Sequence, residues 1–186
     1  MKMRRMIVVA GLGLAVAVAI VGGCSIEIGG EDSTGPYHSE KYGYSITPPA
    51  SWSRESRPTA DVIFFCPSGQ RSAKVHENIV VGIVEQAEGI VLDGRLEEYV
   101  QVEIDSMAAT LNAYRQISLS DVDLGNVKGK RLVFTFTTQD GKEMQTAVYI
   151  TVKGSRGYNI TCSATPESFA KFEKTFDDCA KTFRVD

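Results

Sequence analysis

The last predicted helix carries an unusual concentration of phenylalanine on one face. Thr165-Pro166-Glu167 predicts its start, with a capping threonine, a proline suited to the first helical position and an early acid. The apolar residues that follow recur at helical spacing: Phe169, Phe172, Phe176, Cys179, Ala180 and Phe183. Four of the eight phenylalanines of the chain therefore lie on a single stripe. Because such a stripe must be buried, we expect this helix to cover a β-sheet.

The segments before this helix alternate between apolar and polar residues with the period of two that is typical of β-strands. β-Branched and aromatic runs bounded by turn residues predict strands at 42–46, 61–66, 78–86, 114–124, 128–138, 142–153 and 158–163. The first strand ends at Thr47-Pro48-Pro49 and is expected at a sheet edge. Asp140-Gly141 and the looser segment 153–157 connect the last three strands, which should form an antiparallel meander.

Another helix is predicted within 92–111, between the third and fourth of these strands. Its apolar residues share one face at helical spacing: Leu96, Val100, Ile104, Met107 and Leu111. Asp93 is expected to cap the helix, and Glu97 and Glu98 lie near its positive N-terminus. Glu103 and Asp105 are interpreted as part of a solvated face. The order of strands and helices predicts an α+β fold in which helices cover an antiparallel sheet.

The first 23 residues differ in composition from the rest of the chain. They contain no acid, three basic residues (Lys2, Arg4 and Arg5) and a long apolar run, which is typical of a secretory leader. Without them, 17 basic residues face 23 acidic ones, and the formal net charge changes from −3 to −6. The remaining length fits one domain with a sizeable core. Its acidity disfavours binding to nucleic acid, because an acidic surface repels phosphate.

Val21-Gly22-Gly23-Cys24, at the end of this leader, resembles the lipobox of bacterial lipoproteins. The resemblance implies that residues 1–23 are a lipoprotein signal peptide and that Cys24 receives the lipid. The protein would then be extracytoplasmic and anchored to the cell membrane, or to an outer membrane where the organism has one. Residues 24–36, rich in glycine, serine and acids, are interpreted as a flexible tether with a reach of roughly 20 Å. An uncleaved anchor and cleavage without lipidation are the alternatives.

The remaining segment, 37–186, begins with the motif Tyr42-Gly43-Tyr44-Ser45-Ile46-Thr47-Pro48-Pro49-Ala50-Ser51-Trp52 and ends with the predicted final helix and Thr182-Phe183. These two features resemble the opening and the close of the PsbP/Mog1-like superfamily. The resemblance implies an α/β/α sandwich used for accessory binding rather than for a reaction. We therefore expect a non-catalytic accessory or binding module with a protein partner and no cofactor. The alternative is a small-ligand carrier with a cavity between sheet and helix.

Three cysteines remain when Cys24 is assigned to the lipid: Cys66, Cys162 and Cys179. Outside the cytoplasm, a disulfide of Cys66 with Cys162 or with Cys179 is one alternative, and three unpaired thiols are the other. The pair Cys162–Cys179 is disfavoured, because a strand and a returning helix leave these residues about 10 Å out of step.

Signs of catalysis are weak in this sequence. His38 and His76 are the only histidines, and a site built from His76, Glu77 and a remote carboxylate has no supporting ligand spacing. Neither Gly-x-Ser-x-Gly nor His-Glu-x-x-His occurs. We therefore expect no enzyme activity and no metal. The basic residues near the strand ends are interpreted as scattered surface charge: Lys128, Lys130, Arg131, Lys153 and Arg156.

Overall fold

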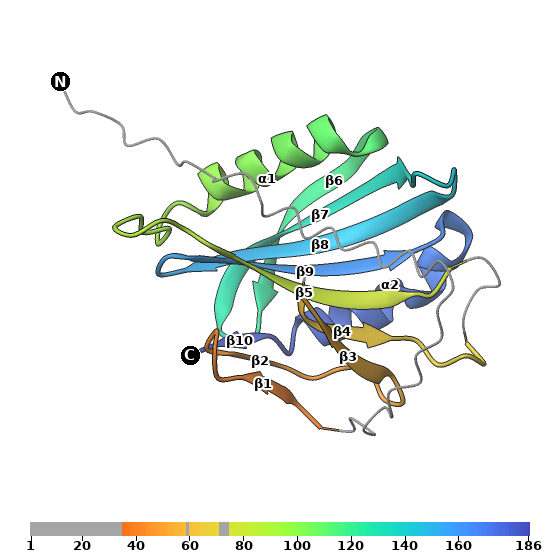
Figure 1. The fold of residues 1–186 in the computed structure, drawn as a ribbon, viewed down its shortest axis with the longest axis horizontal. Coiled ribbons are helices and arrows are strands. Elements are labelled where there is room, and N and C mark those ends of the chain that lie inside the picture. Colours follow the sequence, from red (N-terminus) through yellow and green to blue (C-terminus); the bar gives the residue numbers. More distant parts are fainter. Residues whose placement is uncertain (1–34, 59, 71–74) are drawn as a thin grey trace.

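An antiparallel sheet forms the centre of the fold (Figure 1). The computed structural model describes residues 35–58, 60–70 and 75–186. Within them the large sheet has seven strands in the order β3-β4-β5-β9-β8-β7-β6. The strands are β3 (Ser53–Arg57), β4 (Ala60–Phe65), β5 (Asn78–Glu85), β6 (Asn112–Leu124), β7 (Val127–Thr137), β8 (Glu143–Lys153) and β9 (Arg156–Ala164). The predicted meander of the last three strands is confirmed.

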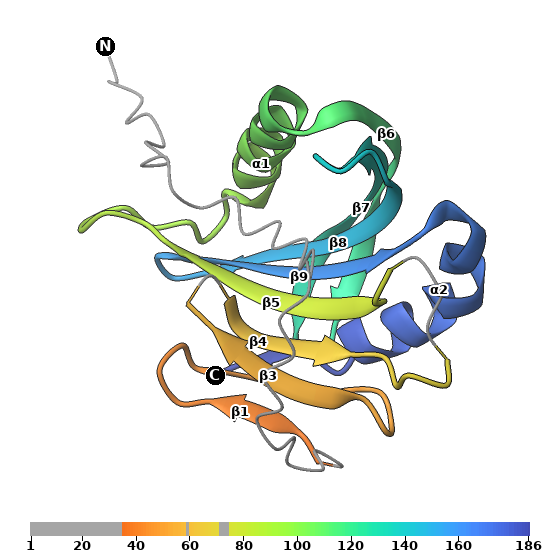
Figure 2. The same ribbon diagram turned by 45° about the vertical axis from the view of Figure 1, so that its right-hand side comes forward.

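Two helices, α1 (Leu96–Thr110) and α2 (Pro166–Ala180), cover opposite faces of this sheet (Figure 2). The alternation along β8 shows the division, because Val148 and Ile150 belong to the core under α1, whereas Ala147 and Tyr149 belong to the core under α2. The predicted α+β sandwich is therefore confirmed. Among the described residues, neither helix combines the length and the apolar composition that a membrane crossing requires.

The start and the apolar stripe of α2 are as the sequence predicts. Thr165 caps the helix, and its hydroxyl oxygen accepts a hydrogen bond from the Ser168 backbone N–H at 3.3 Å. Phe169 and Phe176 are buried against the sheet, together with Phe183 just beyond the helix. The phenylalanine stripe thus fills the space between α2 and the sheet.

The start of α1 differs from the prediction. The helix begins at Leu96, and Arg95 occupies the capping position without a side-chain hydrogen bond to the helix. Asp93, the predicted cap, instead accepts a hydrogen bond from the Gly154 backbone N–H at 2.8 Å. Its carboxylate therefore ties the loop before α1 to the β8–β9 turn.

A small sheet of three strands lies beside α2, against the same face of the large sheet. It consists of β1 (Tyr37–Ser39), β2 (Tyr44–Ile46) and β10 (Arg184–Val185), with β2 in the middle. The predicted edge position of the strand at 42–46 is therefore wrong, because β1 and β10 pair with its two sides. Tyr44 and Ile46 belong to the same buried core as Val62 and Phe64 of β4.

Candidate functional site

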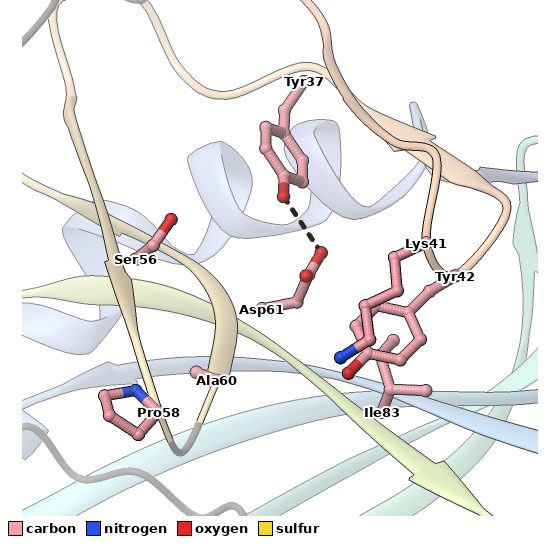
Figure 3. Close-up of a pocket in the computed structure, with 8 residues that line it drawn as sticks. All are labelled: Tyr37, Lys41, Tyr42, Ser56, Pro58, Ala60, Asp61 and Ile83. Carbon is pink, nitrogen blue, oxygen red and sulfur yellow. Dashed lines mark hydrogen bonds between the residues drawn. The ribbon is translucent and has the colours of Figure 1, made fainter.

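A pocket of about 530 Å³ opens between the small sheet and the β3 edge of the large sheet (Figure 3). The β1 strand and the β1–β2 turn form one side, and the β3–β4 hairpin forms the other. The described residues that line it are Tyr37, Lys41, Tyr42, Ser56, Pro58, Ala60, Asp61 and Ile83. Its volume lies within the range of roughly 300–1,000 Å³ that is typical of small-molecule sites.

A β-bulge directs the Asp61 side chain toward this pocket. In the β3–β4 register, Glu55 pairs with Ile63 and Arg57 pairs with Ala60, so that Asp61 and Val62 stand opposite Ser56 alone. A bulge of two residues against one interrupts the alternation of side chains. Asp61 can therefore share the face of its buried neighbour Val62, where strict alternation would place it on the opposite face.

Two tyrosines hold the Asp61 carboxylate. The hydroxyl groups of Tyr37 and Tyr44 both donate to Asp61 Oδ2, at 3.0 and 2.6 Å. Burial, followed by the hydrogen bond to Asp61, raises the pKa of Tyr44, so its hydroxyl stays a proton donor. Oδ1 of Asp61 accepts no hydrogen bond from the described residues. Both of these hydrogen bonds thus involve one carboxylate oxygen, and the other has no such partner among the described residues.

Tyr42, in the β1–β2 turn, forms another wall of the pocket, and hydrogen bonds from β9 hold its backbone in place. The Tyr42 carbonyl accepts hydrogen bonds from the Tyr158 hydroxyl at 2.9 Å and from Arg156 Nη1 at 3.4 Å. Arg156 is itself paired with Glu85, at 3.1 Å between Nε and Oε1. Lys41 Nζ lies 4.5 Å from the centre of the Tyr42 ring, a cation–π contact. The wall therefore presents an aromatic ring and an ammonium group.

The pocket contains two opposite charges that do not pair with each other. Asp61 and Lys41 both line it, yet neither takes part in an ion pair between described residues. Figure 3 shows the Lys41 ammonium beside the Tyr42 hydroxyl group, with Asp61 on the side of Tyr37. The site thus offers separate positions for a cation and for an anion.

The residues that the sequence singles out lie elsewhere. Cys24, the predicted lipidation site, and the leader 1–23 lie outside the described residues. Cys66, Cys162 and Cys179 are free thiols in this structure and are buried in the core on the α2 side. Burial raises the pKa of Cys179 to about 12. Burial, and then the Cys179 thiol, raise the pKa of Cys162 well above its ordinary value.

Sheet geometry also argues against the pair Cys66–Cys162. Cys66 directly follows β4, Cys162 belongs to β9, and β5 runs between these two strands. Strands two positions apart in a sheet are about 10 Å apart, which exceeds the roughly 7 Å between Cα atoms that a disulfide spans. Pairing of Cys66 with Cys179 stays a prediction.

The two histidines are not part of the pocket lining. His38 of β1 is exposed, and His76 lies edge-on to the Phe65 ring at 6.4 Å between ring centres. In the described parts of the chain, no three side chains of histidine, cysteine, aspartate or glutamate are grouped to hold a metal ion.

Sequence reasoning missed the residues that form the pocket. Tyr37, Tyr42 and Tyr44 are three of the seven tyrosines of the chain and lie within eight residues of one another. This grouping of tyrosines was the sequence feature from which the pocket could have been predicted. No sequence feature indicated the partner carboxylate, Asp61, because its orientation depends on the bulge between β3 and β4.

A second buried polar cluster lies under α1, on the other face of the large sheet. Glu103 is only 4% exposed, so its assignment to a solvated face is wrong. Asn159 Nδ2 donates to Glu103 Oε2 at 3.1 Å, and Tyr99 also hydrogen-bonds to this carboxylate. Burial raises the pKa of Glu103 to about 7, although both hydrogen bonds oppose the shift. Oδ1 of Asn159 is buried and accepts no hydrogen bond.

Arg131 likewise differs from its interpretation as scattered surface charge. Its side chain is 17% exposed and joins β7 to α2 through Glu173 at 2.7 Å and Asp177 at 3.0 Å. The Tyr149 hydroxyl of β8 also donates to Asp177. This network attaches the polar side of α2 to the sheet.

Solved structures with the same fold define the class of the domain. The cyanobacterial PsbP protein CyanoP of Synechocystis sp. PCC 6803 is similar over 89% of this chain and 99% of its own, at 18% identity and a TM-score of 0.55. LpqN of Mycobacterium tuberculosis, described as involved in cell envelope biogenesis, is similar over 81% and 89%, at 13% identity and a TM-score of 0.60. PA94 of Pseudomonas aeruginosa is similar over 80% and 94%, at 15% identity and a TM-score of 0.55. The domain therefore has a PsbP-like fold, as the sequence resemblance implied.

The family assignment comes from the sequence. Residues 37–185 match the family described as the serine/threonine kinase C-terminal domain. Because the match covers most of the chain, the protein belongs to this family. No curated protein sequence matches it significantly.

Proposed function

We propose that the protein is a lipid-anchored, extracytoplasmic binding module without catalytic activity of its own. Residues 1–23 would be its signal peptide, Cys24 its lipidated N-terminus, 24–36 its tether and 37–186 its globular domain. The apolar, acid-free leader ending in Val21-Gly22-Gly23-Cys24 supports the anchor. The family match beginning at residue 37 is consistent with this division. The cell-envelope role of LpqN is compatible with an extracytoplasmic location.

The observation that carries the binding role is the pocket around Asp61. Its described lining contains neither histidine nor cysteine, and the Asp61 carboxylate is held by hydroxyl groups that burial keeps protonated. Such a site can bind a charged group, and no hydrogen bond between its described lining residues pairs the Ser56 hydroxyl with a base. Residues 37–185 also contain neither His-Arg-Asp nor Asp-Phe-Gly, two motifs of protein kinase catalysis. An accessory role beside a protein partner is therefore the function we favour.

The position of the pocket suits an anchored protein. Tyr37 lines the pocket and is also the first residue after the proposed tether. A tether of a dozen residues reaches roughly 20 Å, so the bound ligand would stay close to the membrane. The carrier alternative, with a cavity between sheet and helix, has less support, because Phe169 and Phe176 occupy the space under α2.

Metabolic labelling with a palmitate analogue tests the anchor. The wild type should carry the label, and Cys24→Ala should lose it. Cys179→Ala is the matched control, since it removes a buried thiol and should leave the label in place. Equal labelling of the wild type and Cys24→Ala would overturn the proposed anchor.

A further inference from the structure

We propose that the pocket binds a small zwitterion, with its ammonium group at Asp61 and its anionic group at Lys41. This inference rests on the proposed function, because it takes the pocket as the binding site and specifies the chemistry of the ligand. A free metabolite or the headgroup of a zwitterionic lipid could supply this chemistry.

The cationic half of the ligand is recognised by the Asp61 carboxylate. Asp61 Oδ2 is held by the two tyrosine hydroxyls, so Oδ1 is the oxygen available to accept from an ammonium group. Asp61 has no ion-pair partner among the described residues. The ring of Tyr37 lies beside it and already has the Arg54 guanidinium 5.6 Å from its centre, so the carboxylate is the main contact for the ligand cation. Charge-assisted hydrogen bonds of this kind are stronger than neutral ones.

The anionic half is recognised by Lys41. The other cation at this wall, Arg156, is already paired with Glu85 and bonded to the Tyr42 carbonyl. Lys41 takes part in no ion pair between described residues, and a hydrogen bond with the Tyr42 side chain raises the pKa of its ammonium group. Lys41 is therefore the cation that remains available for a phosphate or carboxylate.

The separation of the two charges excludes simpler ligands. Asp61 comes from β4 of the large sheet, whereas Lys41 comes from the turn before β2 of the small sheet. A simple anion bound at Lys41 would face the Asp61 carboxylate, and a simple cation bound at Asp61 would face the Lys41 ammonium. A ligand that carries both charges satisfies both groups, because each of its ends meets the opposite charge.

Titration calorimetry of the full chain tests this inference with O-phosphoethanolamine as the probe. Ethanolamine and inorganic phosphate serve as probes for each half of the ligand. O-phosphoethanolamine should bind, and each half alone should bind about tenfold more weakly, which corresponds to one lost charged contact. Absence of binding, or equally tight binding of either half alone, would overturn the proposal.

Two variants locate the binding. Asp61→Asn keeps an acceptor for both tyrosines but removes the charge, and Lys41→Met removes the ammonium from an exposed turn without disturbing the core. Each should weaken binding about tenfold. Glu88→Gln and Lys171→Met change the same charges at exposed positions away from the pocket and should bind as the wild type does. If both pocket variants bind the probe normally, the assignment of the ligand to this pocket is wrong. If Asp61→Asn fails to fold, the binding of Lys41→Met alone tests the assignment.

Sedimentation of the Cys24→Ala chain with vesicles distinguishes the two sources. Binding to phosphatidylethanolamine vesicles but not to phosphatidylglycerol vesicles, abolished by Asp61→Asn, would identify a lipid headgroup. Binding of soluble O-phosphoethanolamine alone would identify a free metabolite. Lipid labelling at Cys24 is independent of either result, so a chain that is labelled but binds no zwitterion retains the anchor and loses only the ligand assignment.

Discussion

The ring of Tyr99 on α1 lies directly against the backbone of Gly157 on β9. A Cβ atom at residue 157 would overlap the ring at Cζ and at the hydroxyl oxygen, and Tyr99 is fully buried. Gly157→Ala should therefore lower the free energy of unfolding by about 2 kcal/mol, because an overpacked core forces neighbours out of place. Urea denaturation measures the change.

Gly69→Ala is the control for this substitution, since a Cβ there meets no atom within 4 Å. The double variant Gly157→Ala/Tyr99→Leu should be more stable than Tyr99→Leu alone, because the leucine leaves room that the added methyl group can fill. Equal stability of Gly157→Ala and the wild type would contradict the described packing of α1.

The buried carboxyl of Glu103 should make stability depend on pH. Its ordinary pKa of 4.5 is raised to about 7 in the folded protein, so the folded state binds the proton more tightly than the unfolded chain. Between these pH values the free energy of unfolding should fall as pH rises, by about 3 kcal/mol from this group. Glu103→Gln should remove this loss and be more stable than the wild type above pH 7.

Denaturation curves at several pH values, from below 4.5 to 8, measure this effect as the difference between Glu103→Gln and the wild type. Asp105→Asn changes an exposed acid on the same helix and should leave the pH profile of the wild type. A constant difference in stability across the whole pH range would show that Glu103 does not titrate as described.

Arg131 should contribute to the docking of α2. Arg131→Met leaves Glu173 and Asp177 without their shared cation, and the free energy of unfolding should fall by about 2 kcal/mol. Lys174→Met removes a lysine that pairs with Asp178 on the exposed side of the same helix, where about 0.5 kcal/mol or less is expected. Thermal unfolding of both variants under the same conditions makes the comparison, and equal losses would contradict a special role for Arg131.

The three buried cysteines should be reduced in the folded protein. Because burial raises the pKa of Cys179 to about 12, alkylation of this thiol at pH 8 should be slow in the native state and fast in denaturant. Mass spectrometry after alkylation in denaturant without a reductant should find Cys66, Cys162 and Cys179 all modified. Two unmodified cysteines would instead demonstrate a disulfide.

Periodicity predicted the parts of the fold that bury regular apolar faces. The stripe from Phe169 to Phe183 correctly predicted that α2 covers a sheet, and the β-branched runs at 78–86 and 142–153 correctly predicted β5 and β8. The same reasoning missed β3, whose sequence Ser-Arg-Glu-Ser-Arg has no apolar face. It also missed β1 and β10, which are too short to show a period.

Turn chemistry was only partly predictable. Gly154 has a φ of +59° and forms a two-residue connection between Lys153 and Arg156, so the segment expected to be looser is a tight hairpin. At the Asp140-Gly141 turn, Gly141 has positive φ but Asp140 does not, and Thr138 bonds to Lys142 around a three-residue loop. A dipeptide that contains glycine shows where a turn occurs, whereas the length of the turn depends on the register of the strands.

The pocket itself could not be predicted, because it depends on contacts distant in sequence. Asp61 meets Tyr37 and Tyr44 only after a bulge in β4 has changed its orientation. Glu103 was misassigned for a related reason, since its buried partner Asn159 lies on a strand 56 residues away. Local patterns place such residues on an element but do not reveal what faces them.

The pairing of β2 with β10 has a consequence for biosynthesis. Because the ribosome releases the chain from its N-terminus, Tyr44 and Ser45 emerge long before Arg184 and Val185, which pair with them. The small sheet can therefore close only after Arg184 and Val185 have left the ribosome. A chain that lacks these two residues would leave β2 open on one side, within the hairpin that bears Tyr37 and Lys41. The small sheet beside the pocket is thus among the last parts of the domain to form.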